Sequence, residues 1–280
     1  MKAIGEACPT ATTSRPHSQE VLQFRSLAIT EKSGPIRSLA RCLKDAVKRI
    51  LRAQDYRIVY APKGPIAGFN LIDDLRQIID CPNPVCFDIG ANEGQTIELF
   101  EETFKAPRIY SFEPAKDTFA KLKARKFRSQ VIPNNFAFGS ESGQLTFNNY
   151  EDSCLSSFLE LEKGADNRFR SVHIKSKEVV EVRTIDSFVQ QNQIEKIDLL
   201  KIDTQGFDLK VLQGAVETLK SGMIDSVLVE LNFVRMYENQ SGAHLIVSLL
   251  AQHNIHLVDY YEKFRQNHTL AWCSALFTKR

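Results

Sequence analysis

Acidic side chains accompany three apolar runs of the sequence, near the points where those runs end. Asp88 lies near the end of the first run, Glu113 follows the second, and Asp203 follows a later one. Carboxylates can accept hydrogen bonds, balance a cationic ligand, or take a proton from a reacting hydroxyl group. Because parallel strands of an open α/β sheet end along one rim, we expect these three carboxylates to share a ligand site.

The turn after the first apolar run carries Gly90 and Gly94 in the segment DIGANEGQT. Glycine permits the dihedral angles of a tight strand-to-helix turn and lets a ligand approach the backbone. The spacing of these glycines does not match the G-x-G-x-x-G fingerprint, and the P-loop pattern occurs nowhere in the chain. A carboxylate at Asp88 repels a pyrophosphate and attracts a cationic amino-acid group.

Glu113 follows Gly94 by 19 residues, a distance at which an acid commonly binds both hydroxyl groups of a ribose. A ribose without pyrophosphate, joined to a cationic amino-acid group, describes S-adenosylmethionine. We therefore predict this cofactor, with S-adenosylhomocysteine as product. The predicted cofactor contacts lie in the glycine turn and after the next two strands, and they are Asp88, Gly90, Ala91, Asn92, Glu93, Gly94, Thr96, Glu113, Pro114, Asn135, Phe136, Ala137 and Asp203.

The base for the reaction is expected among the acids at the ends of later strands. Methyl transfer to a hydroxyl group benefits from a base within hydrogen-bond reach, and Asp203 is the first candidate and Glu230 the second. His173 is a less favoured alternative in a polar loop. An alternative hypothesis is that one Mg²⁺ is bound by Asp203, Glu230 and Asn232, and we rank it below a mechanism without a metal ion.

The elements that position these residues form an α/β pattern of the Rossmann-like type, with a mostly parallel sheet of seven strands and helices on both faces. The last two strands are joined by a short polar connection, so they pair antiparallel. The expected strands are Val85–Ile89, Arg108–Phe112, Val131–Ile132 with Phe136–Phe138, Ile197–Ile202, Ser226–Glu230, His256–Tyr260 and Ala271–Phe277. The expected helices are Gln95–Phe104, Lys116–Lys126, Ile185–Gln191, Leu209–Lys220 and Ala243–His253.

Three regions flank or interrupt this pattern. Residues 1–34 read as a poorly ordered arm, and residues 35–84 as a basic helical cap that contains an amphipathic helix from Ile36 to about Arg52. The domain then runs from residue 85 to 280. Residues 139–182 interrupt it as an insert, with a hairpin at Gln144–Asn149, a polar loop and a strand at Val179–Val182, and we expect this insert to cover the substrate.

At this point the motifs resemble those of FkbM-type methyltransferases that depend on S-adenosylmethionine. The resemblance rests on FDIGANEGQT, the FEP strand end, the Asn135-x-Ala137 stretch, the Ser156-Ser157 pair, and LKIDTQGFDLKVLQGA followed by VLVELN. It implies O-methylation of a hydroxyl group, often on a sugar or natural product, with Asp203 near the transferred methyl group. Asp208 stands where the family usually has Glu, and the basic region before Val85 has no counterpart.

The composition of the chain limits which classes of function and which partners fit it. The chain has 280 residues with 36 basic and 34 acidic side chains, too balanced for a general affinity for nucleic acid. It has no long apolar run or secretory signal, so we expect a cytoplasmic protein without a transmembrane segment. The basic helix is a candidate for a surface or partner contact, and the oligomeric state stays open. A non-catalytic scaffold with this fold, or a nicotinamide-dependent oxidoreductase, are the alternative functions.

Overall fold

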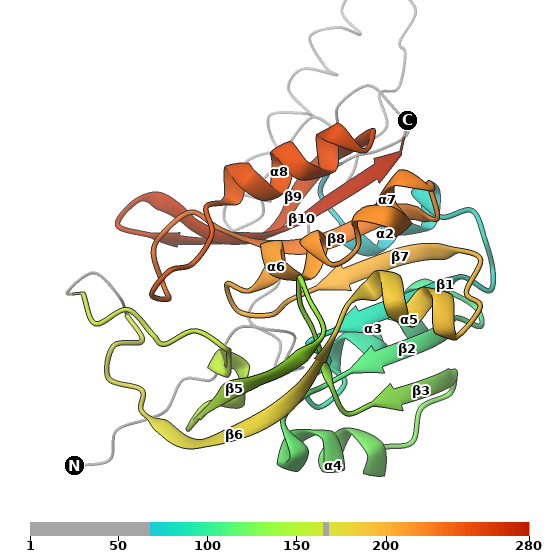
Figure 1. Ribbon diagram of the computed structural model, residues 1–280. Coiled ribbons are helices and arrows are strands. Elements are labelled where there is room, and N and C mark those ends of the chain that lie inside the picture. The colour runs from blue at the N-terminus through green and yellow to red at the C-terminus, as the bar shows by residue number, and fades with distance from the viewer. Residues whose placement is uncertain (1–67, 165–167, 280) are drawn as a thin grey trace, which may run out of the picture. The chain divides into compact units, whose positions relative to one another are not determined.

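A seven-stranded sheet forms the centre of the part of the chain that the computed structural model describes, residues 68–164 and 168–279 (Figure 1). The strand order is β3-β2-β1-β7-β8-β10-β9. The strands are β1 (Val85–Ile89), β2 (Arg108–Phe112), β3 (Gln130–Asn134), β7 (Ile197–Ile202), β8 (Ile224–Asn232), β9 (Ile255–Gln266) and β10 (Thr269–Lys279). The chain order reverses between β1 and β7, and ligands of open α/β sheets bind at such a switch point.

Helices cover both faces of the sheet, each through its own apolar cluster. One cluster holds α5 (Ile185–Gln191), α6 (Asp208–Gln213), α7 (Val216–Lys220) and α8 (Ala243–Gln252). The other holds α2 (Leu71–Ile78), α3 (Gln95–Thr103) and α4 (Lys116–Ala124). The Rossmann-like fold with seven strands is therefore confirmed.

The antiparallel end of the sheet is also confirmed. Strand β10 pairs antiparallel with both β8 and β9. The turn between β9 and β10 consists of Asn267 and His268, both with positive φ, the backbone shape of a tight two-residue hairpin turn. Both strands run longer than the sequence predicts, because pairing in the hairpin continues beyond the apolar residues that mark them.

The prediction for the third strand is wrong in one respect. Val131 and Ile132 lie in β3, but Ala137 and Phe138 form β4 (Ala137–Phe138), which belongs to a separate three-stranded sheet. Strand β3 is the edge of the large sheet, where Pro133 is tolerated because its missing N–H faces no partner strand. The chain leaves the large sheet after β3 and enters the small one.

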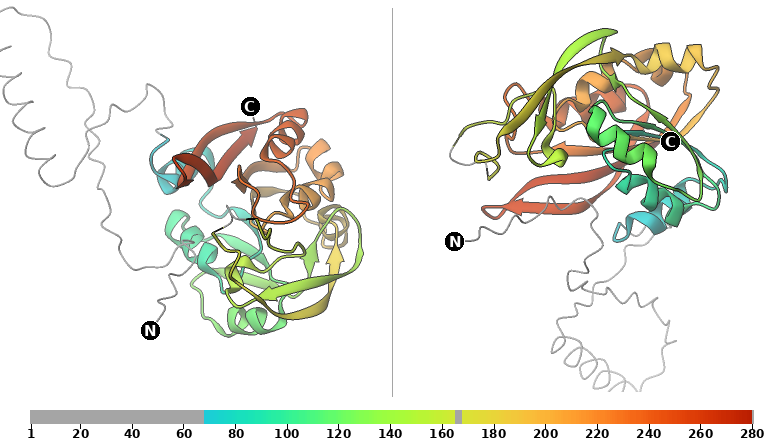
Figure 2. Two further views of the ribbon diagram at one scale, coloured as in Figure 1. Left: turned by 90° about the vertical axis from the view of Figure 1, so that its left-hand side faces the viewer. Right: turned by 90° about the horizontal axis from the view of Figure 1, so that it is seen from below.

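The insert builds the rest of this small sheet, in the order β4-β6-β5. The residues predicted as a hairpin, Gln144–Asn149, lie in one strand, β5 (Gly143–Tyr150), which pairs antiparallel with β6 (Ile174–Arg183). Phe147 and Val180 pack together on the inner face of this small sheet, because the pairing of the two strands places them side by side. A short 3₁₀ helix, Ser153–Leu155, follows β5. Figure 2 (left) looks onto the edge where β1, β2 and β7 end, and the yellow-green insert lies beside it.

The predicted helix Leu209–Lys220 is interrupted, and its two parts are α6 and α7. A Cβ atom on Gly214 would lie 2.0 Å from the carbonyl oxygen of Gly139, so only glycine fits where these backbones meet. The Gly214 carbonyl also accepts a hydrogen bond from the Asp186 amide at 3.0 Å. The first helix ends at Gly214, where the backbone packs against Gly139 and the Gly214 carbonyl bonds to the neighbouring segment.

The predicted arm at residues 1–34 and the basic helix from Ile36 to Arg52 lie outside the described residues and stay predictions. Of the predicted cap at 35–84, the structure describes residues 68–84, where α2 packs in the second cluster. Cys86 and Cys273, each inside an apolar run of the sequence, are buried in the core. Among the described helices, none combines the length and the apolar character needed to cross a membrane.

Candidate functional site

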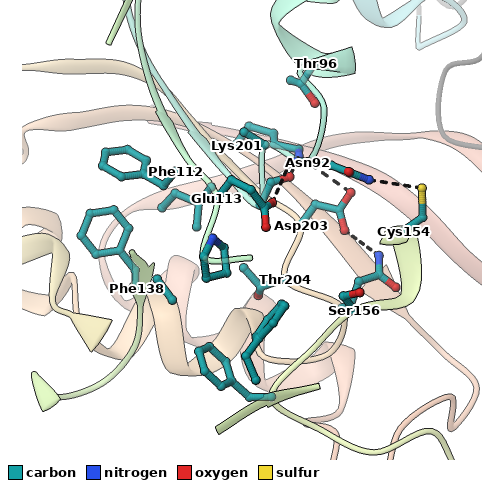
Figure 3. Close-up of a pocket in the computed structure, with 18 of the residues that line it drawn as sticks. Asn92, Thr96, Phe112, Glu113, Phe138, Cys154, Ser156, Lys201, Asp203 and Thr204 are labelled. Atoms are coloured by element: carbon teal, nitrogen blue, oxygen red, sulfur yellow. Dashed lines mark hydrogen bonds and ion pairs between the residues drawn. The ribbon is translucent and has the colours of Figure 1, made fainter. Parts of the chain in front are cut away.

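An open pocket of about 750 Å³, part of it shared with solvent, lies at the carboxyl ends of β1, β2 and β7 (Figure 3). Four parts of the chain form its walls: the glycine turn with the start of α3, the ends of β2 and β7, the segment at β4, and the insert. Its lining includes Gly90, Ala91, Asn92, Thr96, Phe112, Glu113, Pro114, Phe136, Ala137, Phe138, Phe147, Cys154, Ser156, Phe158, Lys201, Asp203, Thr204 and Gln205.

The glycine turn is held tightly against the end of β7. Gly90 has a φ of 77°, and a Cβ atom there would lie 1.9 Å from the Asp203 carbonyl oxygen. The Asp203 amide donates to the Ile89 carbonyl at 3.0 Å, which ties the two strand ends together. Glycine at this position thus allows the ends of β1 and β7 to form one continuous pocket wall.

Glu113 lies at the end of β2 and is 6% exposed. Its Oε2 accepts a hydrogen bond from the Asn92 amide and its Oε1 accepts one from the Ala115 amide, each at 2.9 Å. Burial raises the pKa of Glu113 to about 7, although both backbone hydrogen bonds oppose the rise. Each carboxylate oxygen can accept a further hydrogen bond, so the group is fixed in place and still able to bind two hydroxyl groups.

Asp88 is completely buried beneath the pocket and does not line it. Neither of its carboxylate oxygens has a hydrogen bond of good geometry within the described part of the chain. Burial raises the pKa of Asp88, and the ammonium group of Lys201, 3.1 Å from Oδ1, acts against this rise. The main electrostatic partner of Asp88 is therefore a side chain of the protein itself.

Lys201 joins Asp88 to the pocket wall. Its Nζ atom lies 3.3 Å from the Gly90 carbonyl oxygen and 3.8 Å from Asp203 Oδ2 (Figure 3). Burial lowers the pKa of Lys201, but the charges of Asp88 and Asp203 outweigh burial and raise it overall. Lys201 is therefore a buried cation held by two carboxylates.

Asp203 presents its carboxylate to the pocket with about a fifth of the side chain exposed. Its Oδ1 accepts a hydrogen bond from Gln205 Nε2 at 2.7 Å. The Oε1 atom of Gln205 lies 2.9 Å from the hydroxyl group of Tyr237, which also lies 3.0 Å from the Leu155 carbonyl oxygen of the insert. Asp203 is thus fixed between Lys201 on one side and a chain of hydrogen bonds to the insert on the other.

Asp208 has a structural role in this part of the site. It is 2% exposed and accepts hydrogen bonds from the Thr204 amide at 2.9 Å, the Thr204 hydroxyl at 3.0 Å and the Gly206 amide at 3.1 Å. Burial raises the pKa of Asp208 to about 6. Its carboxylate closes the turn after β7 through these local hydrogen bonds.

The insert lies directly on the glycine turn. Ser153 Oγ lies 3.3 Å from Asn92 Oδ1, and Asn92 Nδ2 donates to Cys154 Sγ at 3.4 Å. Ser157, which is completely buried, donates from its hydroxyl group to the Gln205 carbonyl at 2.9 Å. The insert was expected to cover the substrate, and its side chains do form one wall of the pocket.

Aromatic rings line the opposite end of the pocket from Cys154 and Ser156 (Figure 3). Phe112 and Phe138 have ring centroids 4.6 Å apart, and Phe136 lies 5.3 Å from Phe138. This end offers flat apolar surfaces, whereas the other end offers carboxylates and amides. A ligand with one planar apolar part and one charged polar part matches this division.

Most of the predicted cofactor residues come together in this pocket, but five predicted site residues do not line it. Glu93 is outside and pairs with Lys121, while a Cβ atom on Gly94 would face α4 and Phe127 rather than the pocket. The other three are Asp88, Asn135 and Glu230.

Of these, Asn135 and Glu230 lie close to the site without forming its wall. Asn135 supports the loop by donating from Nδ2 to the carbonyls of Glu113 and Pro114. Glu230 receives a hydrogen bond from Asn232 at 3.1 Å, and burial together with the charge of Asp203 raises its pKa well above the usual range.

The sequence reasoning did not identify Lys201, Gln205 or the insert residues Phe147, Cys154 and Phe158. Lys201 carried a signal, because it is a cation two residues before Asp203 in an otherwise mostly apolar strand and so points to the same side. No comparable signal marks the insert residues. Their place on the pocket wall depends on how the small sheet folds back.

The alternative of a Mg²⁺ site at Asp203, Glu230 and Asn232 finds no support in the arrangement of the side chains. Within residues 68–164 and 168–279, no three His, Cys, Asp or Glu side chains are grouped as metal ligands. Asp203 lines the pocket, whereas Glu230 and Asn232 do not, and Asn232 donates a hydrogen bond to Glu230 at 3.1 Å. These three residues therefore do not fit the group that the sequence suggested.

Comparison with known proteins identifies the family. A profile described as the methyltransferase FkbM domain matches residues 88–257. The 2-O-methyltransferase NoeI of Sinorhizobium fredii is 23% identical over 221 residues, covering 76% of this chain and 89% of NoeI. The hexuronic acid methyltransferase AglP of Haloferax volcanii is 28% identical over 211 residues, covering 75% of this chain and 76% of AglP.

Solved structures with a similar chain path include a TehB-like methyltransferase from Corynebacterium glutamicum, with a TM-score of 0.36 and 11% identity over 88% of this chain and 100% of that one. A putative methyltransferase from Streptococcus mutans has a TM-score of 0.42 and 10% identity over 75% of this chain and 95% of that one. Because the profile match at residues 88–257 spans more than half of the 280 residues, the chain belongs to the FkbM family of methyltransferases.

Proposed function

We propose that this protein transfers a methyl group from S-adenosylmethionine to a hydroxyl group of a sugar-type small molecule. The observation that carries the proposal is that two carboxylates line the same pocket. Glu113 is held by two backbone amides and can still accept hydrogen bonds from a ribose, and Asp203 is exposed to the pocket. The two relatives named for 2-O-methylation and for hexuronic acid methylation support a sugar hydroxyl as the acceptor.

The residues present fit this cofactor. Glu113 offers its remaining acceptor positions to the two ribose hydroxyl groups, and Phe112, Phe136 and Phe138 offer apolar surfaces for adenine. The polar end of the pocket carries Asp203, whose charge suits a sulfonium and an ammonium group. Bound there, the cofactor supplies an activated methyl group for in-line displacement.

Asp203 is the candidate base for the acceptor hydroxyl. Its carboxylate is held by Gln205 and by Lys201, so its position is set before a substrate binds. A hydroxyl group within hydrogen-bond reach of Asp203 would lose its proton to this carboxylate as the new bond to carbon forms. Glu230 is the second candidate base that the sequence suggests, but it does not line the pocket.

The acceptor is a small molecule rather than a nucleic acid under this proposal. Carboxylates at the polar end disfavour a phosphodiester backbone, and nucleic-acid affinity depends largely on cations that contact phosphate. The insert wall, with Phe147, Phe158 and Ser156, would contact the acceptor and exclude water from the reacting atoms. Differences in this wall would then determine which sugar is methylated.

Isothermal titration calorimetry with S-adenosylmethionine and S-adenosylhomocysteine tests the cofactor assignment. We expect micromolar binding, weakened by at least about tenfold in Glu113→Gln, since that variant loses charge-assisted hydrogen bonds. Glu93→Ala is the matched control, because Glu93 lies in the glycine turn but outside the pocket, and it should bind as the wild type does. Binding of NADH, with no binding of either ligand, would contradict the cofactor assignment.

Transfer of a labelled methyl group to a panel of neutral and acidic sugars tests the reaction. With an acceptor in hand, Asp203→Asn should reduce kcat by about 10²–10⁴-fold, the usual contribution of a general base. Its affinity for 5′-methylthioadenosine, which carries neither the sulfonium nor the ammonium group, should change by less than about threefold, since Glu113 and the aromatic end are intact. A kcat within threefold of the wild type would remove Asp203 from the role of base.

A further inference from the structure

A lysine inside the sheet occupies the place where a cationic ligand group would meet Asp88. Strands β1 and β7 are parallel neighbours, and Asp88 and Lys201 stand opposite each other in their register. Both side chains point toward the carboxyl-end turn, where Lys201 Nζ comes within 3.1 Å of Asp88 Oδ1 and 3.3 Å of the Gly90 carbonyl oxygen. The acceptors beside the glycine turn are therefore already engaged by a cation of the chain.

Because both side chains are buried, each charge of the Asp88–Lys201 pair depends on the other for compensation. Asp88 has no exposed surface and Lys201 is 8% exposed, so neither charge has water to compensate it. An unpaired ion in such a position costs several kcal/mol, and removing one partner of a buried pair is strongly destabilising. The structure gives Asp88 no other cation within its described part, and Lys201 has only one other close carboxylate, Asp203 at 3.8 Å.

The two carboxylates beside Lys201 differ in what else they can reach. Asp88 lies outside the pocket wall, while Asp203 forms part of it. Gln205 donates to Asp203 Oδ1 at 2.7 Å, and Lys201 lies on the side of Oδ2. If Lys201 lost Asp88, its ammonium group would move closer to Asp203 and offset the negative charge that Asp203 presents to the pocket.

We propose that Lys201 is a positioning residue, anchored by Asp88, and that Asp203 rather than Asp88 is the carboxylate that faces the positive charges of the bound cofactor. This replaces the direct contact between Asp88 and the cofactor that the sequence suggested. It rests on the proposed function, because the cation in question belongs to S-adenosylmethionine. Asp88 then acts on the pocket only through Lys201.

A double-mutant cycle tests the proposal with two ligands, S-adenosylmethionine and 5′-methylthioadenosine. The second ligand keeps adenosine and sulfur but lacks the sulfonium charge and the amino-acid part. Asp88→Asn leaves Lys201 without its anchor, so affinity for S-adenosylmethionine should fall at least about tenfold, while affinity for 5′-methylthioadenosine stays within about threefold. Adding Lys201→Met removes the displaced cation and should return the first affinity to within about threefold of the wild type.

Three results would overturn the proposal. The double variant binding S-adenosylmethionine as poorly as Asp88→Asn would mean that Asp88 contacts the ligand directly. Equal losses for both ligands would mean that the pair only maintains the fold. Wild-type affinity in Asp88→Asn would mean that the pair has no effect on the pocket. Failure of the wild type to bind any of these ligands is a different result, since it removes the proposed function itself.

The pairing is also measurable without a ligand. Thermal unfolding should show Lys201→Met to be less stable than the double variant, because only the single variant leaves Asp88 buried without a cation. Lys196→Met is the control: Lys196 is also ion-paired, to Asp198 and Asp225, but it lies just before the start of β7, at the end of the strand away from the pocket. It should not change the ratio of the two ligand affinities. Equal stability of Lys201→Met and the double variant would contradict the pairing.

Discussion

Glu113 shows how burial and hydrogen bonding act together on a single side chain. The protein surrounds this carboxyl group with apolar residues, which favours the neutral form, and then directs two backbone amides at it, which favours the charged form. Burial has the larger effect, and the pKa of about 7 places the group near the midpoint of its titration at neutral pH. We therefore expect ligand binding at Glu113 to be accompanied by proton release near neutral pH.

We predict that affinity for S-adenosylhomocysteine rises with pH between 6 and 8. Only ionised Glu113 accepts hydrogen bonds from both ribose hydroxyl groups, and with a pKa of about 7 its ionised fraction increases up to roughly tenfold over this interval. Calorimetry at pH 6, 7 and 8 measures the change. In Glu113→Gln the affinity should be weaker and independent of pH in this range, and a slope that persisted in this variant would assign the effect to another group.

Among the elements, the contact between the end of β1 and the end of β7 decides whether a pocket exists. Two pieces of chain separated by more than a hundred residues meet at Gly90 and Asp203, with no space for a side chain between them. The insert and the segment after β8 then close the site from above, through Tyr237 and the carbonyl of Leu155. Each contact can be weakened by a single substitution.

Gly90→Ala should destabilise the protein and abolish cofactor binding. The positive φ of Gly90 alone costs an alanine about 1–2 kcal/mol, and the overlap of its Cβ with the Asp203 carbonyl oxygen forces the strand ends apart. Gly143→Ala is the control, since nothing lies within 4 Å of the added atom. Thermal unfolding and calorimetry compare the two. Normal binding in Gly90→Ala would show that this backbone contact does not shape the pocket.

Tyr237→Phe should loosen the insert while leaving the sheet intact. Tyr237 is completely buried, and losing its hydroxyl removes a donor from the carbonyl of Leu155 and from the side chain of Gln205. An unsatisfied buried acceptor costs about 1–3 kcal/mol. Hydrogen exchange should speed up in the insert around residues 153–161 and not in β1 or β2. Unchanged exchange in the insert would show that this hydroxyl does not hold it.

For the whole molecule, buried acids make stability depend on pH in an unusual direction. The pKa values of Glu113 and Asp208 are raised to about 7 and about 6, and burial raises those of Asp88 and Glu230 as well. A carboxyl group whose pKa is higher in the folded than in the unfolded state stabilises the fold at low pH. That stabilisation is lost as pH rises through the folded-state value.

We predict that the free energy of unfolding of the ligand-free protein falls between pH 5 and pH 8. Glu113 and Asp208 together account for a loss of a few kcal/mol, on the order of 1.4 kcal/mol for each unit by which a pKa is raised. Urea unfolding at several pH values measures this. S-adenosylhomocysteine at about 100 times its Kd should return about 2.7 kcal/mol at pH 8. A free energy of unfolding that rose over this interval would contradict the burial effect.

Much of the fold and the general place of the site follow from the sequence because they depend on short-range pattern. Apolar runs of strand length alternate with helical periodicity, and Gly90, Glu113 and Asp203 sit at strand ends whichever way the strands pack. The helix at Ile185–Gln191 is predicted to the residue, since Thr184 caps it through a hydrogen bond to the Ser187 amide. The family can also be recognised from the sequence, because each of its motifs is a contiguous stretch of residues.

Tertiary structure alone decides which of these residues face the ligand. Asp88 and Asp203 look equivalent in sequence, but the register of β1 and β7 buries Asp88 against Lys201 and leaves Asp203 at the pocket wall. The sequence predicts the insert as an interruption of the α/β pattern. That the insert forms one wall of the pocket depends on the pairing of β5 with β6 across a long loop. Local pattern fixes where strands end, whereas the balance of buried charge depends on neighbours that are distant along the chain.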